Sequence, residues 1–270
     1  MADRYTFSVS LNNTAKVAAS ERVTEPRIWV VLPTYNEAEN LPQMLDALGG
    51  LGIHLDVVVV DDASPDGTGE IATRAASKNP RVQVIQREGE RGLGTAYLAG
   101  FRYALAAGAD AVITMDCDFS HDPRSIPKMV EAFASADIVI GSRYVVGGST
   151  VNWGLHRKIL SATANRFARA LFRMPVNDCT SGFRLYSRDV LESVVAHAPH
   201  SSGYAFLVEV LQIATRDSNV TVAEVPICFV DRERGSGKMG PREVIDGIKN
   251  LIRLRRGTGT TREQRSVSDE

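Results

Sequence analysis

The sequence has 270 residues, of which 44% are hydrophobic and 23% are charged, and its formal net charge is −1. This is the composition of a soluble globular protein, and the near-neutral balance argues against wholesale binding of nucleic acid. Cys117, Cys179 and Cys228 lie far apart without Cys-x-x-Cys spacing, which argues against a disulfide framework and a structural zinc site. No apolar run approaches the ~20 residues that cross a bilayer.

The two ends of the chain have the composition of unstructured segments. Residues 1–26 are polar and contain no signal-peptide core, so we expect a flexible leader there. Residues 257–270, "GTGTTREQRSVSDE", have the composition of a disordered tail. We therefore expect one folded domain over residues 27–256.

Strands and helices alternate along the first half of this domain. A buried strand is expected from Ile28 to Leu32, broken by Pro33, and a helix follows in residues 36–50 with a Gly49-Gly50 stop. Residues 55–76 repeat the scheme with a four-valine strand, a polar turn and a helix. Further strands are expected in 81–88, 110–118 and 136–143, with helices in 92–108 and 122–135. This alternation predicts an α/β fold whose mostly parallel sheet is covered on both faces.

Polar clusters follow four of these strands. They are "PTYNE", "DDASPDGT", "DCDFSH" and "GSRY". Ligands of open parallel sheets bind beyond the carboxyl ends of the strands, so these clusters are expected to meet at one site.

Asp116 and Asp118 are the most notable pair in these clusters. Side chains two apart on a strand point the same way. Two like charges aimed at one place are unfavourable unless a metal, a shared proton or solvent separates them. The residues alone leave these alternatives open.

The second half contains two basic, amphipathic helices, expected at about 155–174 and 241–256. They either pack on the domain with solvated cations or lie on an anionic membrane surface.

Seven segments then resemble one family: "VVLPTYNEAENLP", "VVVDDASPDGT", "RGLGTAYLAGF", "MDCDFSHDP", "GSRY", "DCTSGFRLY" and "FVDRERGSGKMG". They are similar to the family 2 inverting glycosyltransferases of GT-A fold, and more narrowly to the dolichol-phosphate and polyprenol-phosphate mannose synthases. The resemblance implies transfer of mannose from GDP-mannose to a polyprenyl phosphate, with Mg²⁺ or Mn²⁺ as cofactor. A lipid acceptor and the lack of a spanning segment lead to the hypothesis that the two basic amphipathic helices dock the enzyme on the cytoplasmic face of the membrane, beside a membrane-embedded partner protein.

The resemblance assigns residues to this reaction. The residues implied to hold the nucleotide are Pro33, Tyr35, Glu37, Val60 and Asp62. Those implied beside the diphosphate are Asp116, Cys117 and Asp118, the two aspartates coordinating the metal, with Ser120 as a weak further ligand where some relatives have Gln. Those implied to bind phosphates are Arg143, Arg232 and Lys238, although "GSGK" stands where relatives have "GESK".

The acceptor chemistry suggests further residues. A phosphate monoester has a second pKa near 6, so the reaction needs no strong base. Arg143 and Arg157 are candidates for binding the acceptor phosphate, because arginine forks bind phosphates bidentately. Asp178 is expected to act as a base, to contact a sugar hydroxyl, or to order its turn. His121 either supports the metal loop or fills a turn.

Other functions remain open at this point. They are a polyprenyl-phosphate glucosyltransferase using UDP-glucose, a sugar-phosphate nucleotidyltransferase, a glycosidase using Asp116 and Asp118, and a non-catalytic, transferase-like recruiting subunit. "PTYNE" after the first strand argues against the nucleotidyltransferase, whose Gly-rich basic loop is expected there. The intact Asp pair argues against the recruiting subunit.

Overall fold

A seven-stranded sheet forms the centre of the computed structural model, which describes residues 25–89, 92–201, 203–231 and 250–255. Its strands are β1 (Ile28–Thr34), β2 (Leu55–Asp61), β3 (Val82–Gln86), β4 (Ala111–Thr114), β5 (Ile138–Ser142), β7 (Arg184–Ser187) and β8 (Val222–Pro226). Their order is β3-β2-β1-β4-β7-β5-β8, and only β7 runs antiparallel to its neighbours. The predicted mostly parallel sheet is confirmed.

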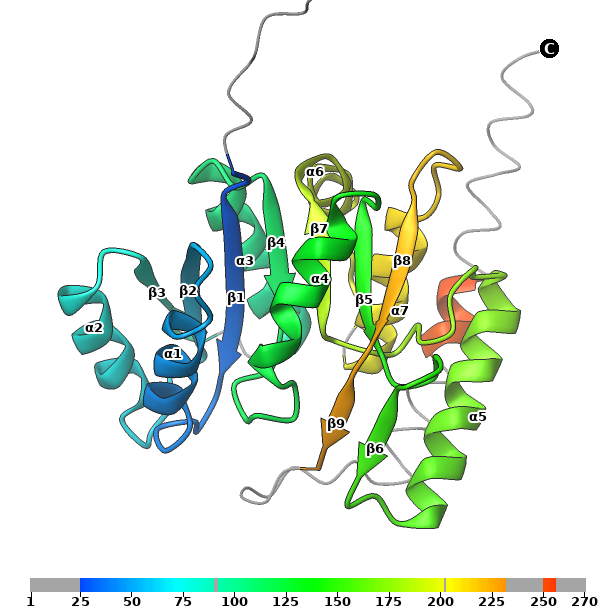
Figure 1. Cartoon of the computed structure of the whole chain (residues 1–270), viewed down its shortest axis with the longest axis horizontal. Helices are drawn as coiled ribbons and strands as arrows, with labels where there is room; N and C mark the ends of the chain where they lie inside the picture. Colours follow the sequence, from blue (N-terminus) through cyan, green and yellow to red (C-terminus); the bar gives the residue numbers. More distant parts are fainter. Residues whose placement is uncertain (1–24, 90–91, 202, 232–249, 256–270) are drawn as a thin grey trace, which may run out of the picture.

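Helices cover both faces of this sheet (Figure 1). They are α1 (Leu41–Gly49), α2 (Thr68–Lys78), α3 (Leu93–Ala106), α4 (Ile126–Phe133), α5 (Leu155–Phe172), α6 (Arg188–His197) and α7 (Tyr204–Ala214), with a 3-10 turn, η1, at Pro123–Ser125. Alternate strand residues enter two separate cores, because successive side chains point to opposite faces. Val31 packs on the α3, α6 and α7 side, whereas Val30 and Leu32 pack on the α1 and α4 side.

Pro33 does not end the first strand, which was predicted to stop at Leu32. β1 continues to Thr34, and Pro33 pairs in register with Val60 of β2. The Val31 carbonyl accepts a hydrogen bond from the Met115 N–H, which follows β4. Every second residue of a strand faces the same neighbouring strand, so the backbone of Pro33 also faces the β4 side. Pairing with β4 ends at Val31, so the missing N–H of Pro33 costs no ladder hydrogen bond.

β7 was not predicted as a strand. It is four residues long, and its first residue, Arg184, is a fully buried cation. The guanidinium donates to the carbonyls of Cys179 and Leu207 at 2.7 Å each and to the Tyr186 hydroxyl at 3.0 Å. These hydrogen bonds offset the cost of burial, so a charged residue occupies a position where sequence patterns predict an apolar one.

A second, two-stranded parallel sheet consists of β6 (Ser149–Val151) and β9 (Cys228–Val230). α5 follows β6 and begins at the end of the molecule toward which β1, β6 and β9 point (Figure 1). α5 spans Leu155–Phe172, which confirms the helix predicted at 155–174. Only Asn165 and Ala168 of α5 are buried. No helix of the described residues is long and apolar enough to cross a membrane.

The remaining sequence predictions fall largely outside the described residues. This holds for the leader up to residue 24, for the tail at 257–270, and for the second amphipathic helix up to residue 249. Residues 250–255 of that helix are helical.

Close packing of α3 on the sheet gives a stability prediction. A Cβ at Gly100 would lie 2.3 Å from Cγ1 of buried Val31. Gly100→Ala should therefore lower the free energy of unfolding by about 1–3 kcal/mol, because overpacking outweighs the helix propensity of alanine. Gly49→Ala, in α1, is the control, since its Cβ would meet nothing within 4 Å. Denaturant unfolding of both variants measures the difference, and equal stability would contradict this packing.

Candidate functional site

Two adjoining pockets lie beyond the carboxyl ends of β1, β2 and β4. The first pocket, of roughly 440 Å³, is lined by Pro33, Thr34, Tyr35, Glu37, Asp62, Gly92, Leu93, Ala96, Asp116 and Cys117. The second pocket, of roughly 340 Å³, is lined by Leu93, Tyr97, Asp116, His121, Arg143, Thr180, Ser181, Gly182, Gly203, Leu207 and Phe229. Leu93 and Asp116 line both pockets, so one carboxylate is exposed to ligands in either.

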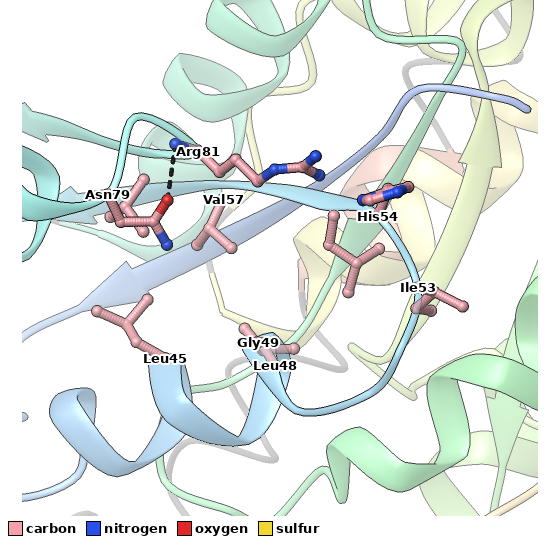
Figure 2. A pocket seen from close by; sticks show the side chains of 10 residues that line it. Leu45, Leu48, Gly49, Ile53, His54, Val57, Asn79 and Arg81 are labelled. Atoms are coloured by element: carbon pink, nitrogen blue, oxygen red, sulfur yellow. Dashed lines mark hydrogen bonds between the residues drawn. The ribbon is translucent and has the colours of Figure 1, made fainter.

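A third hollow lies at the opposite edge, where β2 and β3 begin (Figure 2). Leucine, isoleucine and valine side chains form most of its wall, and His54 and Arg81 are its ionisable residues. It contains no carboxylate. None of the described polar residues that sequence analysis selected lines it, so the first two pockets form the candidate site.

Hydrogen bonds tie the loops after β1 and β2 to each other. The Ser64 hydroxyl donates to Asp61 at 2.6 Å and accepts from the Asn36 N–H at 3.0 Å. Asp66 accepts from the Ala38 N–H at 3.0 Å. Asn36 has a positive φ of 58°, a conformation that asparagine tolerates. Much of the polarity in "PTYNE" and "DDASPDGT" therefore orders the rim of the first pocket.

Four of the five predicted nucleotide-binding residues line the first pocket. Tyr35 is 44% exposed at the pocket, whereas Glu37 is buried and accepts a 2.7 Å hydrogen bond from Asn40. Val60 is the exception. Its side chain is fully buried in the core with Val31 and α3. Val60 does not line the pocket, so its predicted part in closing the pocket gains no support and stays a prediction.

Asp62 is held by a buried arginine that sequence analysis missed. Arg87 donates through Nε at 2.7 Å and Nη2 at 2.5 Å to Oδ1 of Asp62, and the Gly92 N–H donates to Oδ2 at 3.0 Å. Two guanidinium N–H groups on Oδ1 and one backbone N–H on Oδ2 therefore fix the carboxylate in the pocket wall. No sequence spacing pointed to Arg87, which lies just after β3.

Asp116 and Asp118 lie in a loop and not on a strand. β4 ends at Thr114, so the expectation that strand alternation aims the two carboxylates together is wrong. The loop turns through Phe119, with a φ of 61°, and the Ser120 N–H donates to Asp118 at 3.0 Å. The pair is thus placed by a tight turn, in which Asp116 faces both pockets.

His121 supports this loop from inside the protein. Its Nδ1 accepts a 3.0 Å hydrogen bond from the Asp116 backbone N–H. Burial, reinforced by the nearby Arg143 charge, lowers the pKa of His121 to about 3. The imidazole is therefore neutral at ordinary pH, and its 3.8 Å approach to the Asp116 carboxylate is not an ion pair. The supporting role considered for His121 agrees with this geometry.

The carboxylates suit a divalent cation that brings further ligands with it. Mg²⁺ and Mn²⁺ prefer carboxylate oxygens. Within the described residues no group of three or more His, Cys, Asp or Glu side chains could enclose a metal by itself. Asp116, which lines both pockets, fits an ion whose other ligands are water and the oxygens of a bound substrate. Asp118 follows in the same loop but lines neither pocket, and its carboxylate accepts a hydrogen bond from the Ser120 N–H. Ser120 is 2% exposed and lines neither pocket, so its weak assignment as a ligand gains no support.

A buried ion pair joins the end of β5 to the segment before β7. Arg143 donates to Asp178 through Nε at 2.7 Å and Nη2 at 2.8 Å, and its backbone N–H donates to the same carboxylate at 3.0 Å. Burial raises the pKa of Asp178, but the Arg143 charge and the hydrogen bonds reverse this and leave the pKa lowered. Asp178 is fully buried. The geometry favours a role in orienting Arg143 over the catalytic role that the sequence suggested.

Arg157 lies in the first turn of α5. Its Nη1 donates to Asp231 at 2.5 Å, and its guanidinium carbon is 4.4 Å from the ring centroid of Trp153. Arg143 also approaches Trp153, at 5.7 Å, and so the structure brings the two candidate acceptor arginines to one ring. Arg232 and Lys238, which follow Asp231 in the chain, lie outside the described residues.

Comparison with known proteins agrees with this arrangement. Residues 29–195 match the model of the family described as "Glycosyl transferase family 2". The chain is 42% identical to the undecaprenyl-phosphate mannosyltransferase of Micrococcus luteus over 84% of this chain and 93% of that protein. It is 40% identical to the polyprenol monophosphomannose synthase of Mycolicibacterium smegmatis over 90% of this chain and 94% of that protein.

Solved structures support the fold. Glucosyl-3-phosphoglycerate synthase from Mycobacterium tuberculosis, solved with Mn²⁺, UDP-glucose and phosphoglyceric acid, superposes with a TM-score of 0.61 at 20% identity, covering 86% of this chain and 80% of that one. Another structure, of a mycobacterial protein, has a TM-score of 0.62 at 21% identity, covering 84% and 72%. At this identity the likeness concerns the fold. Together with the sequence matches, it places the chain in glycosyl transferase family 2, and the protein is a glycosyltransferase.

Proposed function

We propose that this glycosyltransferase transfers mannose from GDP-mannose to the phosphate of a polyprenyl phosphate, with inversion at the anomeric carbon. The names of two relatives that are at least 40% identical over most of the chain support mannose and a polyprenyl phosphate. The observation that carries the proposal is Asp116, which lies where the two pockets meet. Donor and acceptor bound in these pockets would therefore meet at one carboxylate.

The first pocket would take the nucleotide of the donor. Tyr35 offers an exposed aromatic face for the base, and the buried carboxylates of Glu37 and Asp62 offer acceptors for base or ribose N–H and O–H groups. The Arg87 fork keeps Asp62 oriented. The diphosphate would then lie at Asp116, Cys117 and Asp118, with the sugar directed toward the second pocket.

Asp116 and Asp118 would hold Mg²⁺ or Mn²⁺ together with the diphosphate. When bound, such an ion neutralises the charge that develops on the departing nucleotide. The similar glucosyl-3-phosphoglycerate synthase was solved with both Mn²⁺ and UDP-glucose, which supports this assignment. The buried His121 keeps the Asp116 backbone in place.

The second pocket would bind the acceptor phosphate. Arg143 lines it, and Arg157 shares the Trp153 ring with Arg143. A phosphate oxygen would attack the anomeric carbon while the bond from that carbon to the diphosphate oxygen breaks and GDP leaves. Because the acceptor is already largely ionised at neutral pH, no residue needs to take its proton.

An exposed apolar patch supports a membrane-bound acceptor. Val151, Leu155 and Ile159, at the end of β6 and the start of α5, are 41%, 74% and 59% exposed. Leu155 and Ile159 are four apart and share one face of the helix. Because α5 begins at the end of the molecule where the site lies (Figure 1), this patch could rest on an anionic membrane surface while the acceptor enters. A cytoplasmic membrane face and a membrane-embedded partner remain part of the proposal.

The metal role predicts the effect of Asp118→Asn. Transfer from labelled GDP-mannose to a short polyprenyl phosphate should require Mg²⁺ or Mn²⁺ and should fall at least about 100-fold in the variant, by analogy with losses of single charge-stabilising groups. Binding of Mn²⁺ with GDP, followed by electron paramagnetic resonance, should weaken in parallel. Asp122→Asn is the matched control, because Asp122 pairs with exposed Arg124 outside both pockets. Full activity of Asp118→Asn, or activity that survives complete metal removal, would contradict the assignment.

The orienting role of Asp178 gives a second prediction. Asp178→Asn should lower the free energy of unfolding by about 3–5 kcal/mol, because it leaves the buried Arg143 without its charged partner. The pH profile of the remaining activity should keep the rise near pH 6 that ionisation of the acceptor phosphate produces. Thermal unfolding and kcat/KM between pH 5 and 8 measure both effects. A folded variant of normal stability that has lost this rise would instead identify Asp178 as a base.

The exposed patch predicts membrane binding. Replacing Leu155 and Ile159 together by Ser should reduce co-flotation with anionic liposomes about tenfold or more, since each side chain would contribute ~1.5–3 kcal/mol when buried in lipid. Ala170→Ser, on an exposed position late in the same helix, should bind as the wild type does. Unchanged flotation of the double variant would exclude this face as the docking surface.

A further inference from the structure

Trp153 lies where two arginines from different elements meet. It follows β6, and pairing of β6 with β9 places Phe229 against it with the ring centroids 5.5 Å apart. The guanidinium carbon of Arg157 is 4.4 Å from the Trp153 centroid, and that of Arg143 is 5.7 Å from it. The face of an indole ring attracts cations. Both guanidiniums therefore lie close to one indole ring.

The two arginines offer the donors that a phosphate needs. Arg143 is paired with Asp178, and Arg157 is paired with Asp231, so the aspartates balance their charges. A guanidinium has five N–H donors, more than one carboxylate accepts. A phosphate that touched both arginines would match the donor geometry of the guanidinium.

The indole N–H of Trp153 adds a second observation. The side chain is 8% exposed, and Nε1 has no hydrogen-bond acceptor among the described residues. A buried N–H without an acceptor is unfavourable and calls for an explanation. A ligand oxygen bound between the two arginines would be a suitable acceptor.

The neighbours of Trp153 in the chain indicate which ligand carries that oxygen. Val151 and Leu155, two residues before and two residues after Trp153, are 41% and 74% exposed. An anion site beside an exposed apolar surface fits a phosphate attached to a hydrocarbon chain. Asp116, where the donor diphosphate is proposed to lie, belongs to the wall shared by the two pockets and not to this apolar edge.

We propose that the indole N–H of Trp153 donates a hydrogen bond to a phosphate oxygen that Arg143 and Arg157 also bind, and that this phosphate belongs to the lipid acceptor. This inference rests on the proposed function, because it names a binding residue for the acceptor of that reaction. The donor diphosphate is the other source of phosphate oxygens, and the experiments below separate the two.

Kinetics of two Trp153 variants test the inference. Trp153→Phe keeps an aromatic ring for the arginines and loses the N–H, so the KM for the polyprenyl phosphate should rise about tenfold, the size expected for one hydrogen bond to a charged group. Trp153→Leu also loses the cation–π contacts, and its KM should rise roughly tenfold further. In both variants the KM for GDP-mannose and the kcat should stay within about twofold. An unchanged acceptor KM in Trp153→Phe, or an equal rise of the donor KM, would overturn the inference.

Fluorescence tests the same contact without altering it. The chain has 2 tryptophans, so Trp29→Phe, a change in the core near Tyr103, leaves Trp153 as the single emitter. Farnesyl phosphate should shift or quench this emission, whereas farnesol and GDP-mannose should not. A full response to farnesol or to GDP-mannose, or none to saturating farnesyl phosphate, would overturn the proposal.

The two proposals fail in distinguishable ways. If the wild type forms no mannosyl lipid, the proposed function fails, while the fluorescence response to farnesyl phosphate still decides whether Trp153 contacts a phosphate. If the wild type is active and both Trp153 variants keep its acceptor KM, the proposed function stands and the role of Trp153 is rejected.

Discussion

The buried ion pair between Arg143 and Asp178 is the interaction on which the second pocket depends. Arg143 directly follows β5, and Asp178 lies in the segment before β7, so the pair joins the ends of two neighbouring strands of the sheet. Each charge would be costly to bury alone, and the bidentate geometry compensates both. The same guanidinium lies against Tyr144, Trp153 and Phe229, and it therefore positions the aromatic residues around the pocket.

Function follows from how the chain divides its charges between two pockets. Carboxylates dominate the strand ends of β1, β2 and β4, which suits a metal and the hydroxyl and N–H groups of a nucleotide. On the side toward β5 and α5, Arg143 and Arg157 add two guanidiniums, each paired with an aspartate, and guanidiniums suit a second phosphate. Asp116 lies on the boundary between the two pockets. A metal held by carboxylates would balance the donor diphosphate, and the guanidiniums would balance the acceptor phosphate, so each anionic substrate would have its own cation.

Local sequence patterns were sufficient for much of the fold. The valine-rich strands β1 and β2, the helices between them and the parallel order follow from periodicity and turn residues, and the strand-end clusters located the site. β7 escaped prediction because Arg184 occupies its buried face, and only hydrogen bonds to distant carbonyls make that position acceptable. Val60 belongs to a motif that runs from strand core to loop, and its side chain lies in the core. Such features depend on tertiary neighbours that spacing does not reveal.

The residues around the arginines were the hardest to predict. Asp178 was recognised as a candidate from the sequence. Its ion pair with Arg143, 35 positions away in the chain, forms only in the folded structure and could not be read from the sequence. Arg87 and Trp153 belong to no recognised motif. Arg87 stands out only because it binds Asp62 in the folded structure. Trp153 stands out only because the guanidiniums of Arg143 and Arg157 lie against its ring. Residues selected for their position at a strand end, such as Asp116, do lie at the candidate pockets, and their roles stay predictions.

The most direct test of the central claim is a transfer assay of the wild-type chain with paired labelled donors. Equal amounts of labelled GDP-mannose and UDP-glucose are offered, in separate reactions with Mg²⁺, to a short polyprenyl phosphate and to the corresponding alcohol. The account predicts a mannosyl lipid from GDP-mannose and the phosphate alone. A glucosyl lipid as the main product would contradict the donor, product with the alcohol would contradict the phosphate-binding arginines, and no product with either donor would contradict catalysis itself.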